Sequence, residues 1–586
     1  MKKDKVIKKQ IIKEASSNPE KYFPVEFLKS KGFKRYKCEK TGMMFWSTVP
    51  RKFSGDTDVV GGYQFIENTP AKKSLEFTEV YKEFSKHMTK RGYKHINRFP
   101  IVARWRDDLD FNIASIIGFQ PYVTGGEIAP PAKMLTIPQN CLRFPDIDNV
   151  GYTGRHHTSF TMIGQHVFKK PQEYDQTKYV KDFLEWFTDV MKIPIDEIQI
   201  HEDAWTGGGN CGPSLEFFSR GLELGNQVYM WYDMSEAENI DDLKELNIKV
   251  LDMGMGLERC CWYSKGSLNS FEANMPRVIQ YLKDKTGIVP DWKFYRKFVP
   301  LGGNLNLDEV DDIDKEWENI SKELKVEVEE LKNQIESIAG LYSIADHSKT
   351  LLYALTDGAL PSNVKGGYNL RLVLRRALDF IHKFDWDIDL YDVIVVQAEE
   401  VSELYPELRN ELEGIKKIID LETKKYKNHK EKVDNKIKSI LNKKDKLELE
   451  DFVKYYISEG ITPEEIKQSY ENNGKTISIP ANFYTAVNEY FESRKESEVK
   501  ENKNKLKEFI KDVPDTKMEF YKDTYKDETN AKILKEFEFE KKKFVVLNKT
   551  LFYPTMGGQA HDIGFIGDKK VVDVIKVEGV ILHQIE

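Results

Sequence analysis

The chain has 586 residues, of which 40% are hydrophobic and 32% are charged, so it is long enough for about three or four domains with ordinary cores. Its net charge of −7 means that nucleic-acid binding would need local basic faces. The sequence lacks both a long apolar run and the apolar stretch of a secretory signal, which predicts no membrane span and no export. The few cysteines do not make a disulfide framework and indicate reduced thiols in the cytoplasm.

Residues 1–74 mix a basic helical stretch with a turn-rich stretch and predict an appended N-terminal module. From Leu75 to about Gly92 the apolar residues recur at helical spacing, which predicts an amphipathic helix. Its apolar positions are Phe77, Val80, Phe84 and Met88. Residues 96–265 are richer in Gly, Pro and aromatic residues, and strand-like runs such as NQVYMWYD and IKVLDMG alternate with Gly-rich turns. That composition favours a mixed antiparallel sheet with a concave site.

The second half of the chain changes character twice. The pattern is mostly helical from about residue 270 to residue 515, and β signals return from residue 516. The stretch 416–446 is very rich in lysine, which is more typical of a solvated helix than of an RNA contact. The closing run VVDVIKVEGVILHQIE needs partner strands, so the β pattern is unfinished. Either the sequence is a piece of a longer one or the missing half is a separate polypeptide.

The first chemical signal is CLRFPDIDNVGYTGRHHTSF, residues 141–160. Arg143 is followed by a basic and aromatic cluster, and that pattern suits a triphosphate. A guanidinium offers a fixed fork of donors to phosphate oxygens, and Phe160 can stack on a purine. The alternative is a surface loop with stray basic residues.

The second signal is KVLDMGMGLERCCW, residues 249–262, where a strand-like run ends in a Gly-x-Gly turn before a helix. Glycines let the backbone approach a ligand closely. Arg259, at the start of that helix, would meet an anionic ligand with help from the helix dipole. The alternative is an ordinary turn.

The third signal is residues 201–233, in which three consecutive glycines lie near Trp205 and Glu216 and suggest a tight pocket. In the strand that follows, alternation places Asn226 and Val228 on one face. The alternative is a Gly-rich hairpin with buried aromatic residues.

Together, the three segments resemble the core of the class II aminoacyl-tRNA synthetases, specifically the alanyl-tRNA synthetases of the archaeal type. RFPIVARWRDDLDFNIASIIGFQP resembles the first family motif, with Pro100 as its proline, and the segments around Arg143 and Arg259 resemble the second and third motifs. The resemblance implies an α+β fold: an antiparallel sheet flanked by helices, then a mainly helical tRNA-recognition region and the start of a β-barrel domain. The implied regions are a catalytic domain at 75–270, an acceptor-stem recognition region at 271–515 and an incomplete start of the editing region at 516–586.

The resemblance also implies roles for individual residues. The catalytic residues would be Arg143 at the α-phosphate of ATP, Arg259 at its β/γ end and Asp252 at the ammonium of alanine, because a buried cation needs a fixed counter-charge. Phe160 would stack on adenine, and Glu216 would touch the adenine side or a magnesium ion. The ATP-binding residues would be Arg143, His156, Phe160, Glu216, Gly254, Gly256 and Arg259. The alanine-binding residues would be Trp205, Asn226, Val228 and Asp252.

The implied reaction begins with in-line attack of the alanine carboxylate on the α-phosphorus of ATP, and the alanyl group then passes to the 3′ end of tRNA(Ala). No general base is needed because a carboxylate is already charged, so catalysis would rest on positioning and on charge neutralisation by Arg and Mg²⁺. A pocket for alanine cannot strongly exclude glycine or serine, because a methyl or hydroxyl group is worth only about 1–3 kcal/mol. Such an enzyme therefore needs hydrolytic editing.

Residues 345–384 resemble the acceptor-stem recognition region of the same family. Their helical pattern places Arg371, Arg375 and Arg376 near one face, and these are the predicted tRNA-binding arginines. Asn363 matches the family's asparagine that reads the G·U pair of the acceptor stem, and an amide oxygen suits the exocyclic amine of guanine. Without the resemblance, a solvated basic helix is the alternative.

The family's second reader of that pair is an aspartate, and Ile457 falls at its place. Isoleucine cannot accept a hydrogen bond. Either a neighbour such as Glu459 substitutes, the alignment is displaced, or the pair is read differently.

The zinc pattern of archaeal relatives is not matched in the N-terminal module. Those relatives carry several cysteines there, whereas this chain has Cys38 with Thr41 and Ser54 at the later positions. One thiolate does not make a zinc site, so no metal is predicted there. Cys260 and Cys261 suit a buried core better than a ligand set.

Residues 551–566 resemble the opening strands of the family's editing region. His561 and His583 do not have the spacing of its zinc ligands. We therefore predict no hydrolysis of mischarged tRNA by this chain alone. A separate polypeptide that carries the editing and C-terminal domains is a candidate partner.

The leading interpretation is a cytoplasmic enzyme that activates alanine with ATP and Mg²⁺, charges tRNA(Ala) and does not associate with a membrane. A non-catalytic tRNA-binding relative is the main alternative, but it would be expected to have lost Arg143, Arg259 or Asp252, and all three are present. A class II ligase that acts on a small molecule without tRNA is disfavoured by the segment around Asn363.

Overall fold

The structure is a computed structural model divided into two compact units. The first unit comprises residues 1–99, 113–353 and 376–416, and the second comprises residues 100–112, 354–375 and 417–586. The described residues are 2–106, 109–120, 122–207, 209–234, 237–302, 305, 313–363, 365–441, 447–459, 461–480, 483, 486–487, 490, 506–520, 526, 528–539, 542–554 and 561–586.

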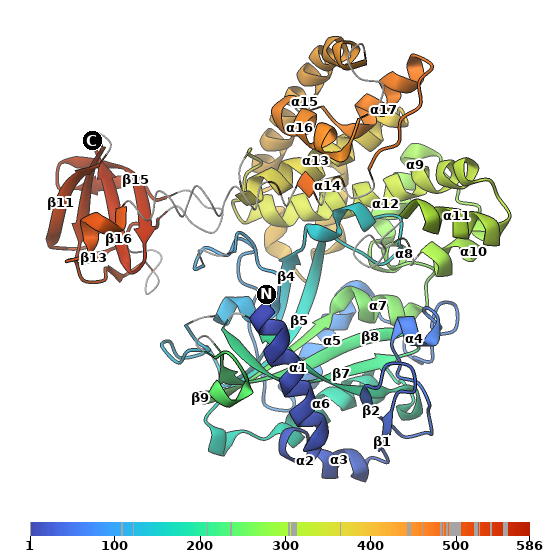
Figure 1. The fold of residues 1–586 in the computed structure, drawn as a ribbon, viewed down its shortest axis with the longest axis vertical. Helices are drawn as coiled ribbons and strands as arrows, with labels where there is room; N and C mark the ends of the chain where they lie inside the picture. Colours follow the sequence, from blue (N-terminus) through green and yellow to red (C-terminus); the bar gives the residue numbers. More distant parts are fainter. Residues whose placement is uncertain are drawn as a thin grey trace. The chain divides into compact units, whose positions relative to one another are not determined.

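A nine-stranded sheet forms the centre of the first unit (Figure 1). Its strand order is β1-β2-β6-β7-β8-β9-β5-β4-β3, and all neighbours are antiparallel except β3 and β4. The strands are β1 (Lys34–Lys37), β2 (Met44–Ser47), β3 (Lys94–His95), β4 (Met134–Leu142), β5 (Ser159–Lys169), β6 (Gln199–Gly207), β7 (Asn210–Ser219), β8 (Leu222–Asp233) and β9 (Lys244–Gly256). The predicted antiparallel sheet is thereby confirmed, and its two predicted strand runs lie in β8 and β9.

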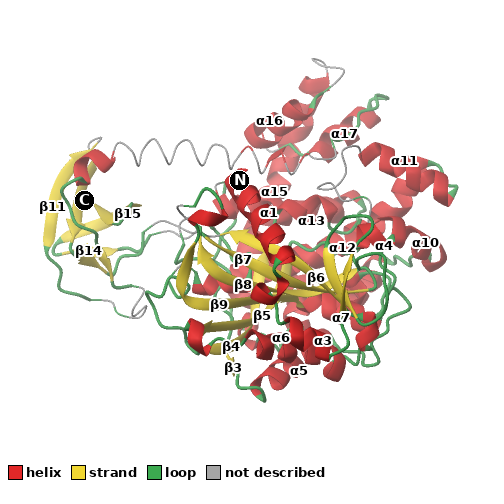
Figure 2. Cartoon of the chain, turned by 60° about the horizontal axis from the view of Figure 1, so that its bottom comes forward, coloured by secondary structure: helices red, strands yellow, loops and turns green. Residues whose placement is uncertain are grey.

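The helices, coloured red in Figure 2, lie before, between and after the strands of this sheet. The described helices are α1 (Lys2–Ser17), α2 (Pro19–Tyr22), α3 (Val25–Ser30), α4 (Thr57–Val60), α5 (Phe77–Thr89), α6 (Gln176–Glu185), α7 (Leu257–Lys265), α8 (Ser270–Asn274), α9 (Pro276–Thr286), α10 (Trp292–Gly302), α11 (Ile313–Leu324), α12 (Val328–Thr356), α13 (Lys365–Lys383), α14 (Leu390–Glu400), α15 (Leu412–Leu441), α16 (Leu449–Glu459) and α17 (Pro463–Asn472). The prediction of a mainly helical stretch after about residue 270 is confirmed for the described residues.

Helix α5 is the amphipathic helix predicted from Leu75 to about Gly92. It begins with a capping box in which Glu76 and Glu79 exchange side-chain and backbone hydrogen bonds, which satisfies two backbone donors at the helix start. The four apolar positions of its predicted face are all buried. Burial of these apolar side chains holds α5 against the rest of the first unit. The ring of Phe84 packs edge-on against that of Trp186, with ring centroids 5.2 Å apart.

Helices α1 and α6 cover one face of the sheet. Ile7 of α1 is buried in a cluster with Ala204 of β6, and Phe183 of α6 packs edge-on against Phe217 of β7 at 4.9 Å. Phe217 pairs with Ile200, which lies four residues from Ala204 in the same strand. Because side chains alternate along a strand, both helices therefore contact the same face and leave the other face to the site.

The other face carries an apolar floor. Ile137 of β4, Val228 of β8 and Val250 of β9 are buried there in one cluster with residues of the segment 113–123. Ile116 and Phe119 of that segment are the main contributors, and both lie in a short 3₁₀ turn. This floor ends where the polar residues of the candidate site begin.

The N-terminal residues contribute to the same sheet. β1 and β2 form an antiparallel hairpin, and β2 pairs with β6 through Phe45 with His201 and Ser47 with Gln199. The sheet therefore continues across the predicted boundary at residue 74. In the described part of the chain, no helix has the length and apolarity needed to cross a membrane.

A second sheet forms near the C-terminus, within the second unit. Its strand order is β11-β12-β16-β15-β14, all antiparallel, and a short parallel pair, β10 with β13, lies apart from it. Apolar residues such as Val546 and Val574 fill two buried clusters of this sheet. The strands are β10 (Lys517–Met518), β11 (Ile533–Phe539), β12 (Lys542–Leu547), β13 (Lys549–Thr550), β14 (Gly564–Ile566), β15 (Lys569–Val577) and β16 (Val580–Ile585). The predicted return of β structure after residue 516 is confirmed.

Candidate active site

Three consecutive strands, β7, β8 and β9, bring predicted site residues together on one face of the nine-stranded sheet. Asp252 of β9 pairs with Val228 of β8. Two residues farther along, Gly254 pairs with Asn226, which in turn pairs with Glu216 of β7. Residues two apart in a strand point to the same face, so these five residues form two adjacent rows. The predicted alanine and ATP residues of β7, β8 and β9 are therefore neighbours in space.

Arg143 and Phe160 face each other across the hairpin formed by β4 and β5. The guanidinium of Arg143 lies 4.8 Å from the centroid of the Phe160 ring. Its Nη2 and Nε donate to the carbonyl oxygen of Ile113 at 3.0 and 3.3 Å. The Arg143 side chain is exposed, so its donors are held in place but remain accessible to an anionic ligand.

A buried carboxylate fixes the backbone next to Arg143. The amide of Arg143 donates to the carbonyl of Thr158 at 2.9 Å, and the amide of Thr158 donates to both oxygens of Asp346 at 3.1 and 3.2 Å. The hydroxyl of Thr158 also donates to Asp346. Burial disfavours the charged form of Asp346, but hydrogen bonds to His157 and His347 outweigh it and hold the pKa of that carboxyl well below its usual range.

A second buried carboxylate fixes the backbone next to Phe160. The amide of Thr161 donates to both oxygens of Glu258 at 3.0 and 3.1 Å, and Lys349 donates to Glu258 at 3.2 Å. The side chains of Lys349 and Glu258 are both almost fully buried. Lys349 and Asp346 lie three residues apart on α12, so one helix contacts both Thr158, just before the strand that carries Phe160, and Glu258, at the start of α7.

Arg259 occupies the first turn of α7, as predicted. Its Nη1 donates to a carboxylate oxygen of Glu223 at 2.7 Å and to the Glu223 carbonyl at 3.3 Å, and about half of the Arg259 side chain is exposed. A Cβ at Gly256 would lie 3.3 Å from the Arg259 side chain, so a side chain there would press on this arginine. The glycine gives Arg259 room next to the sheet.

His156 lies between two arginines. Its Nδ1 is 2.8 Å from the hydroxyl of Thr153. Burial, followed by the charges of Arg155, His157 and Arg259, lowers the pKa of His156 to about 3. Without a ligand the imidazole is therefore neutral at pH 7. Arg155 was not singled out from the sequence, although its place beside His156 in the loop GYTGRHH was a signal that could have identified it.

Asp252, one of the predicted alanine-binding residues, has a buried carboxyl. Burial raises the pKa of Asp252 to about 7, and Nδ1 of His166 lies 3.4 Å from one of its oxygens. Burial also lowers the pKa of His166 to about 3, so this imidazole supplies no positive charge at neutral pH. Val228 belongs to the apolar floor, and Trp205 packs against that floor. The carboxyl of Asp252 is therefore buried beside an apolar wall.

Glu216 lies near other carboxyl groups on this face. Burial raises its pKa well above the usual range, and the negative charges of Glu223 and Asp203 add to the shift. Asn226, a predicted alanine-binding residue, donates to Glu223 at 3.0 Å, and Glu223 is also the carboxylate that binds Arg259. A cation would stabilise the charged form of these carboxyls, and two carboxylates such as Glu216 and Glu223 suit Mg²⁺, which takes its other ligands from water and substrate phosphates.

Comparison with known proteins identifies the family of this chain. The sequence profile described as tRNA synthetases class II (A) matches residues 79–586. The chain belongs to the class II tRNA synthetases.

Three relatives of this synthetase carry the name alanine–tRNA ligase. The protein of Methanocella arvoryzae is 41% identical over 100% of this chain and 65% of its own length. Those of Methanococcus aeolicus and Nitrosopumilus maritimus are 37% and 36% identical over 96% and 99% of this chain, and over 64% and 63% of their own lengths. This synthetase thus spans just under two thirds of each of these relatives. A solved pyrrolysyl-tRNA synthetase from Desulfitobacterium hafniense matches 34% of this chain and 73% of its own at 13% identity, and its TM-score of 0.26 supports no conclusion.

The predicted tRNA residues of the synthetase do not share one environment. Nε and Nη2 of Arg371 donate to the two carboxylate oxygens of Glu422 at 2.9 and 3.1 Å, and its Nη1 donates to the amide oxygen of the exposed Asn363. Arg375 is partly exposed. Arg376 is buried and its Nη1 lies 3.8 Å from a carboxylate oxygen of Asp148.

Ile457 lies in α16 and is partly exposed. The side chain of Glu459, the neighbour considered as a substitute for the family's aspartate, lies outside the described residues.

The cysteines of the synthetase are all buried. The hydroxyl of Ser54 lies 3.5 Å from the sulfur of Cys38. Cys260 and Cys261 are buried core residues, as predicted, and the Cys261 thiol donates to the carbonyls of Leu75 and Ala273. Among the residues that the structure describes, no three His, Cys, Asp or Glu side chains form a cluster able to hold a metal.

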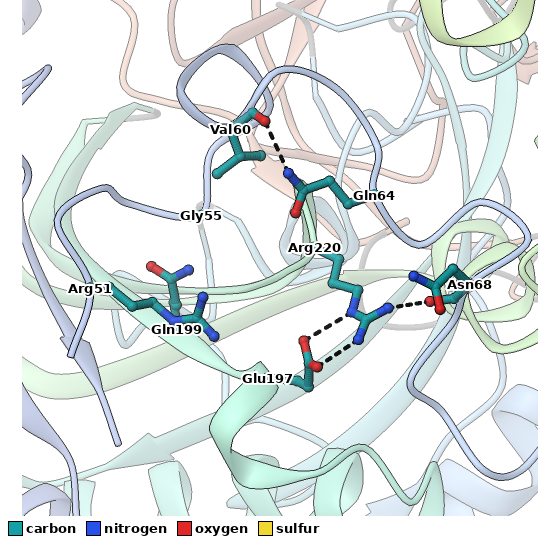
Figure 3. A pocket seen from close by; sticks show the side chains of 9 residues that line it. Arg51, Gly55, Val60, Gln64, Asn68, Glu197, Gln199 and Arg220 are labelled. Carbon is teal, nitrogen blue, oxygen red and sulfur yellow. Dashed lines mark hydrogen bonds and ion pairs between the residues drawn. The ribbon is translucent and has the colours of Figure 1, made fainter. Parts of the chain in front are cut away.

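The synthetase also has a polar cavity of about 420 Å³ (Figure 3). Arg220 donates to both oxygens of Glu197 across it, at 2.6 and 3.0 Å. Its lining, among the described residues, includes none of the predicted site residues. The lining residues are Arg51, Gly55, Val60, Gln64, Asn68, Glu197, Gln199, Arg220 and Gly221.

Proposed function

We propose that this synthetase is an alanine–tRNA ligase that activates alanine with ATP and transfers it to the 3′ end of tRNA(Ala) in the cytoplasm. The observation that carries the proposal is the buried carboxyl of Asp252, paired in the sheet with Val228 of the apolar floor, on the same face as Arg143 and Arg259. A buried carboxyl beside an apolar wall suits an ammonium group with a small side chain. The names of the relatives support the same substrate.

In the proposed first step the alanine carboxylate attacks the α-phosphorus of ATP. Arg143 contacts the α-phosphate, and Arg259 with His156 receives the β/γ end. Because triphosphate charge favours a protonated imidazole, ATP binding would raise the pKa of His156 from its low ligand-free value. The side chains act by positioning and charge stabilisation, since the attacking carboxylate is already ionised.

Adenine recognition would use Phe160. One face of that ring is occupied by the Arg143 guanidinium, so adenine stacks on the opposite face or exchanges places with the arginine. A Cβ at Gly254 would approach the sulfur of Met162 to 3.0 Å and Asn226 to 3.7 Å. The glycine thereby leaves space for the adenylate between the adenine and alanine sides of the face.

Class II synthetases use ATP with Mg²⁺, and Glu216 and Glu223 are the residues that would hold the ion here. Bound Mg²⁺ would neutralise charge on the pyrophosphate leaving group. The structure supports this part of the proposal through the mutual repulsion of the Glu216, Glu223 and Asp203 carboxyls.

Recognition of the acceptor stem is proposed for Asn363 and Arg375. Arg371 uses one lone pair of the Asn363 amide oxygen and leaves the second available to a guanine amine. In this proposal Arg371 orients Asn363, whereas Arg376 supports the fold from a buried position.

We assign a function to each region of the chain, in order from the N-terminus. Residues 75–270 hold the strands of the site and form the catalytic domain, with 1–74 as an appended module that extends its sheet. Residues 271–515 form the acceptor-stem recognition region, and 516–586 form the opening part of an editing region. No editing is proposed for this chain alone, because His583 is buried and bonded to Thr550 at 2.8 Å, with a pKa lowered to about 4 by burial. A separate polypeptide with the editing and C-terminal domains is a proposed partner.

The test is exchange of pyrophosphate into ATP with alanine, serine or glycine. Alanine should stimulate exchange most strongly, and Asp252→Asn and Arg259→Ala should each abolish it. Charging of acceptor stems with and without the G·U pair then tests the second step. Absence of exchange with every amino acid would refute the activation site and favour the non-catalytic tRNA-binding alternative.

A further inference from the structure

A segment outside the matched family region reaches the candidate ATP site. The match begins at residue 79, and Tyr63 lies before it. Backbone hydrogen bonds fix the segment that carries Tyr63: the amide of Gln64 donates to the Arg220 carbonyl at 2.9 Å, and the amide of Glu67 donates to the Gly266 carbonyl at 2.7 Å. The segment is thus attached to the β7–β8 hairpin and to the end of α7.

Aromatic packing fixes the Tyr63 ring against α7. Its centroid lies 5.2 Å from that of Trp262 in an edge-on arrangement, and Phe65 packs against both rings at 5.8 and 4.8 Å. Trp262 follows Arg259 by three residues, so both lie on one side of the same helix. The ring of Tyr63 therefore takes its position from the helix that carries Arg259.

The hydroxyl of Tyr63 contacts the other arginine of the site. Nη1 of Arg155 donates to the Tyr63 oxygen at 2.8 Å, and the Arg155 guanidinium lies 5.4 Å from the ring centroid. Burial lowers the pKa of Arg259, but the neighbouring Glu223 and Tyr63 raise it, and the net shift is upward. The phenol is thus close to both cations.

An interaction that keeps Arg155 near Arg259 is needed because both side chains are positively charged. Tyr63 accepts from Arg155 at 2.8 Å and packs on Trp262, three residues from Arg259 on α7, so its side chain links the two arginines, whose like charges repel each other. A phenol oxygen accepts from one guanidinium without adding a negative charge that would repel phosphate. Holding Arg155 in place before ATP arrives reduces the ordering that binding requires.

We propose that Tyr63 is a positioning residue of the ATP site, whose hydroxyl holds Arg155 beside Arg259 so that both guanidinium groups meet the triphosphate. The inference rests on the proposed ATP-dependent function. It assigns a part in nucleotide binding to the N-terminal module and adds Arg155 to the predicted ATP residues.

The experiment compares Tyr63→Phe with the wild-type full chain. The substitution removes the hydroxyl and keeps the ring that packs on Trp262, so the thermal midpoint should stay unchanged. We expect the KM for ATP in alanine-dependent pyrophosphate exchange to rise about five-fold, as for loss of one hydrogen bond to a charged group, with the KM for alanine unchanged. The Kd for α,β-methylene-ATP should rise by the same factor.

A double-substitution cycle tests whether Tyr63 acts through Arg155. In an Arg155→Ala background, Tyr63→Phe should change the nucleotide Kd by less than about two-fold, because the group that it positions is gone. An effect of equal size in both backgrounds would overturn the proposal, as would an unchanged Kd in Tyr63→Phe alone.

Two controls separate the hydroxyl from general disturbance. Tyr36→Phe removes a phenol oxygen elsewhere in the N-terminal module, on β1, and Gln64→Ala alters the neighbour of Tyr63 that lines the cavity in Figure 3. Both should leave the nucleotide Kd unchanged, and a five-fold effect of Gln64→Ala would contradict a specific part for Tyr63. If wild-type exchange with alanine fails while nucleotide binding persists, the proposed function falls, but the binding cycle still decides the part of Tyr63. Failure of the wild type to bind the nucleotide overturns both.

Discussion

The proposed ATP site and the proposed acceptor-stem segment both contain arginines, but they hold them in different ways. In the ATP site, buried carboxylates bind the backbone beside Arg143, and the arginine side chain itself is exposed. In the acceptor-stem segment the side chain of Arg371 is bound directly by the buried Glu422, and only 15% of it is exposed. An arginine held through its backbone can meet a ligand, whereas one held through its guanidinium works by fixing its neighbours.

Replacing Arg143 tests the first half of this comparison most severely. Arg143→Ala should lower alanine-dependent exchange by about 100- to 1000-fold, as expected when a donor to developing transition-state charge is lost. Thermal stability should change little because the side chain is exposed. Arg409→Ala, which removes an exposed ion-paired arginine far along the chain, serves as the control. A small effect of Arg143→Ala would mean that Arg143 is only a surface residue.

Asp346→Asn tests the buried carboxylate that holds the backbone next to Arg143. Asparagine has one acceptor oxygen where the carboxylate offers two, so the bonds to Thr158 and the neighbouring histidines cannot all persist. We expect unfolding to become easier by about 2–4 kcal/mol and exchange to fall about ten-fold, mainly through a higher KM for ATP. Glu336→Gln, on the same helix but on its surface, is the matched control. Full activity of Asp346→Asn would show that Arg143 does not depend on this carboxylate.

Arg371→Gln tests the second half of the comparison. Loss of the contacts to Glu422 and Asn363 should reduce charging of the acceptor stem about ten-fold and weaken discrimination of the G·U pair, with pyrophosphate exchange unchanged. Arg375→Gln should reduce charging less and leave discrimination intact, because a phosphate contact carries no base information. The opposite ranking would make Arg375 the residue that orients Asn363.

The last expected effect is a pH dependence of alanine binding. The ammonium of alanine needs the ionised form of Asp252, whose pKa of about 7 lies above that of the unfolded chain, so the KM for alanine should fall about ten-fold from pH 6 to pH 8. The nearby His166, with a pKa of about 3, does not titrate in this window. The sign reverses for the empty protein, which should lose stability as pH rises between about 4 and 7. A flat KM profile would place the ammonium elsewhere.

The sequence predicted much of the fold because its signals are local. The apolar spacing of Phe77, Val80, Phe84 and Met88 identified α5, and alternating runs identified β8 and β9. The predicted ATP and alanine residues lie on few strands, and strand pairing alone brings Asp252, Val228 and Asn226 into adjacent rows.

The supporting residues could not be predicted because their partners are distant in the chain. Asp346 binds Thr158 across 188 residues, Tyr63 binds Arg155 across 92 residues and Arg371 binds Glu422 across 51 residues. No pattern within a single element records such a pair. The basic spacing of the acceptor-stem helix was visible, but the buried acid that binds Arg371 lies on another helix.

Asp346 and Lys349, the two residues of α12 that bind the candidate site, also limit which insertions and deletions the chain can accept. Asp346 and Lys349 are three residues apart, and each residue of an α-helix turns the next one by about 100°. Inserting or deleting a single residue between them would therefore rotate one of the two side chains away from its partner, Thr158 or Glu258, while the other stayed in place. Substitutions elsewhere on the helix do not shift Asp346 and Lys349 relative to each other. The number of residues between the two must stay the same.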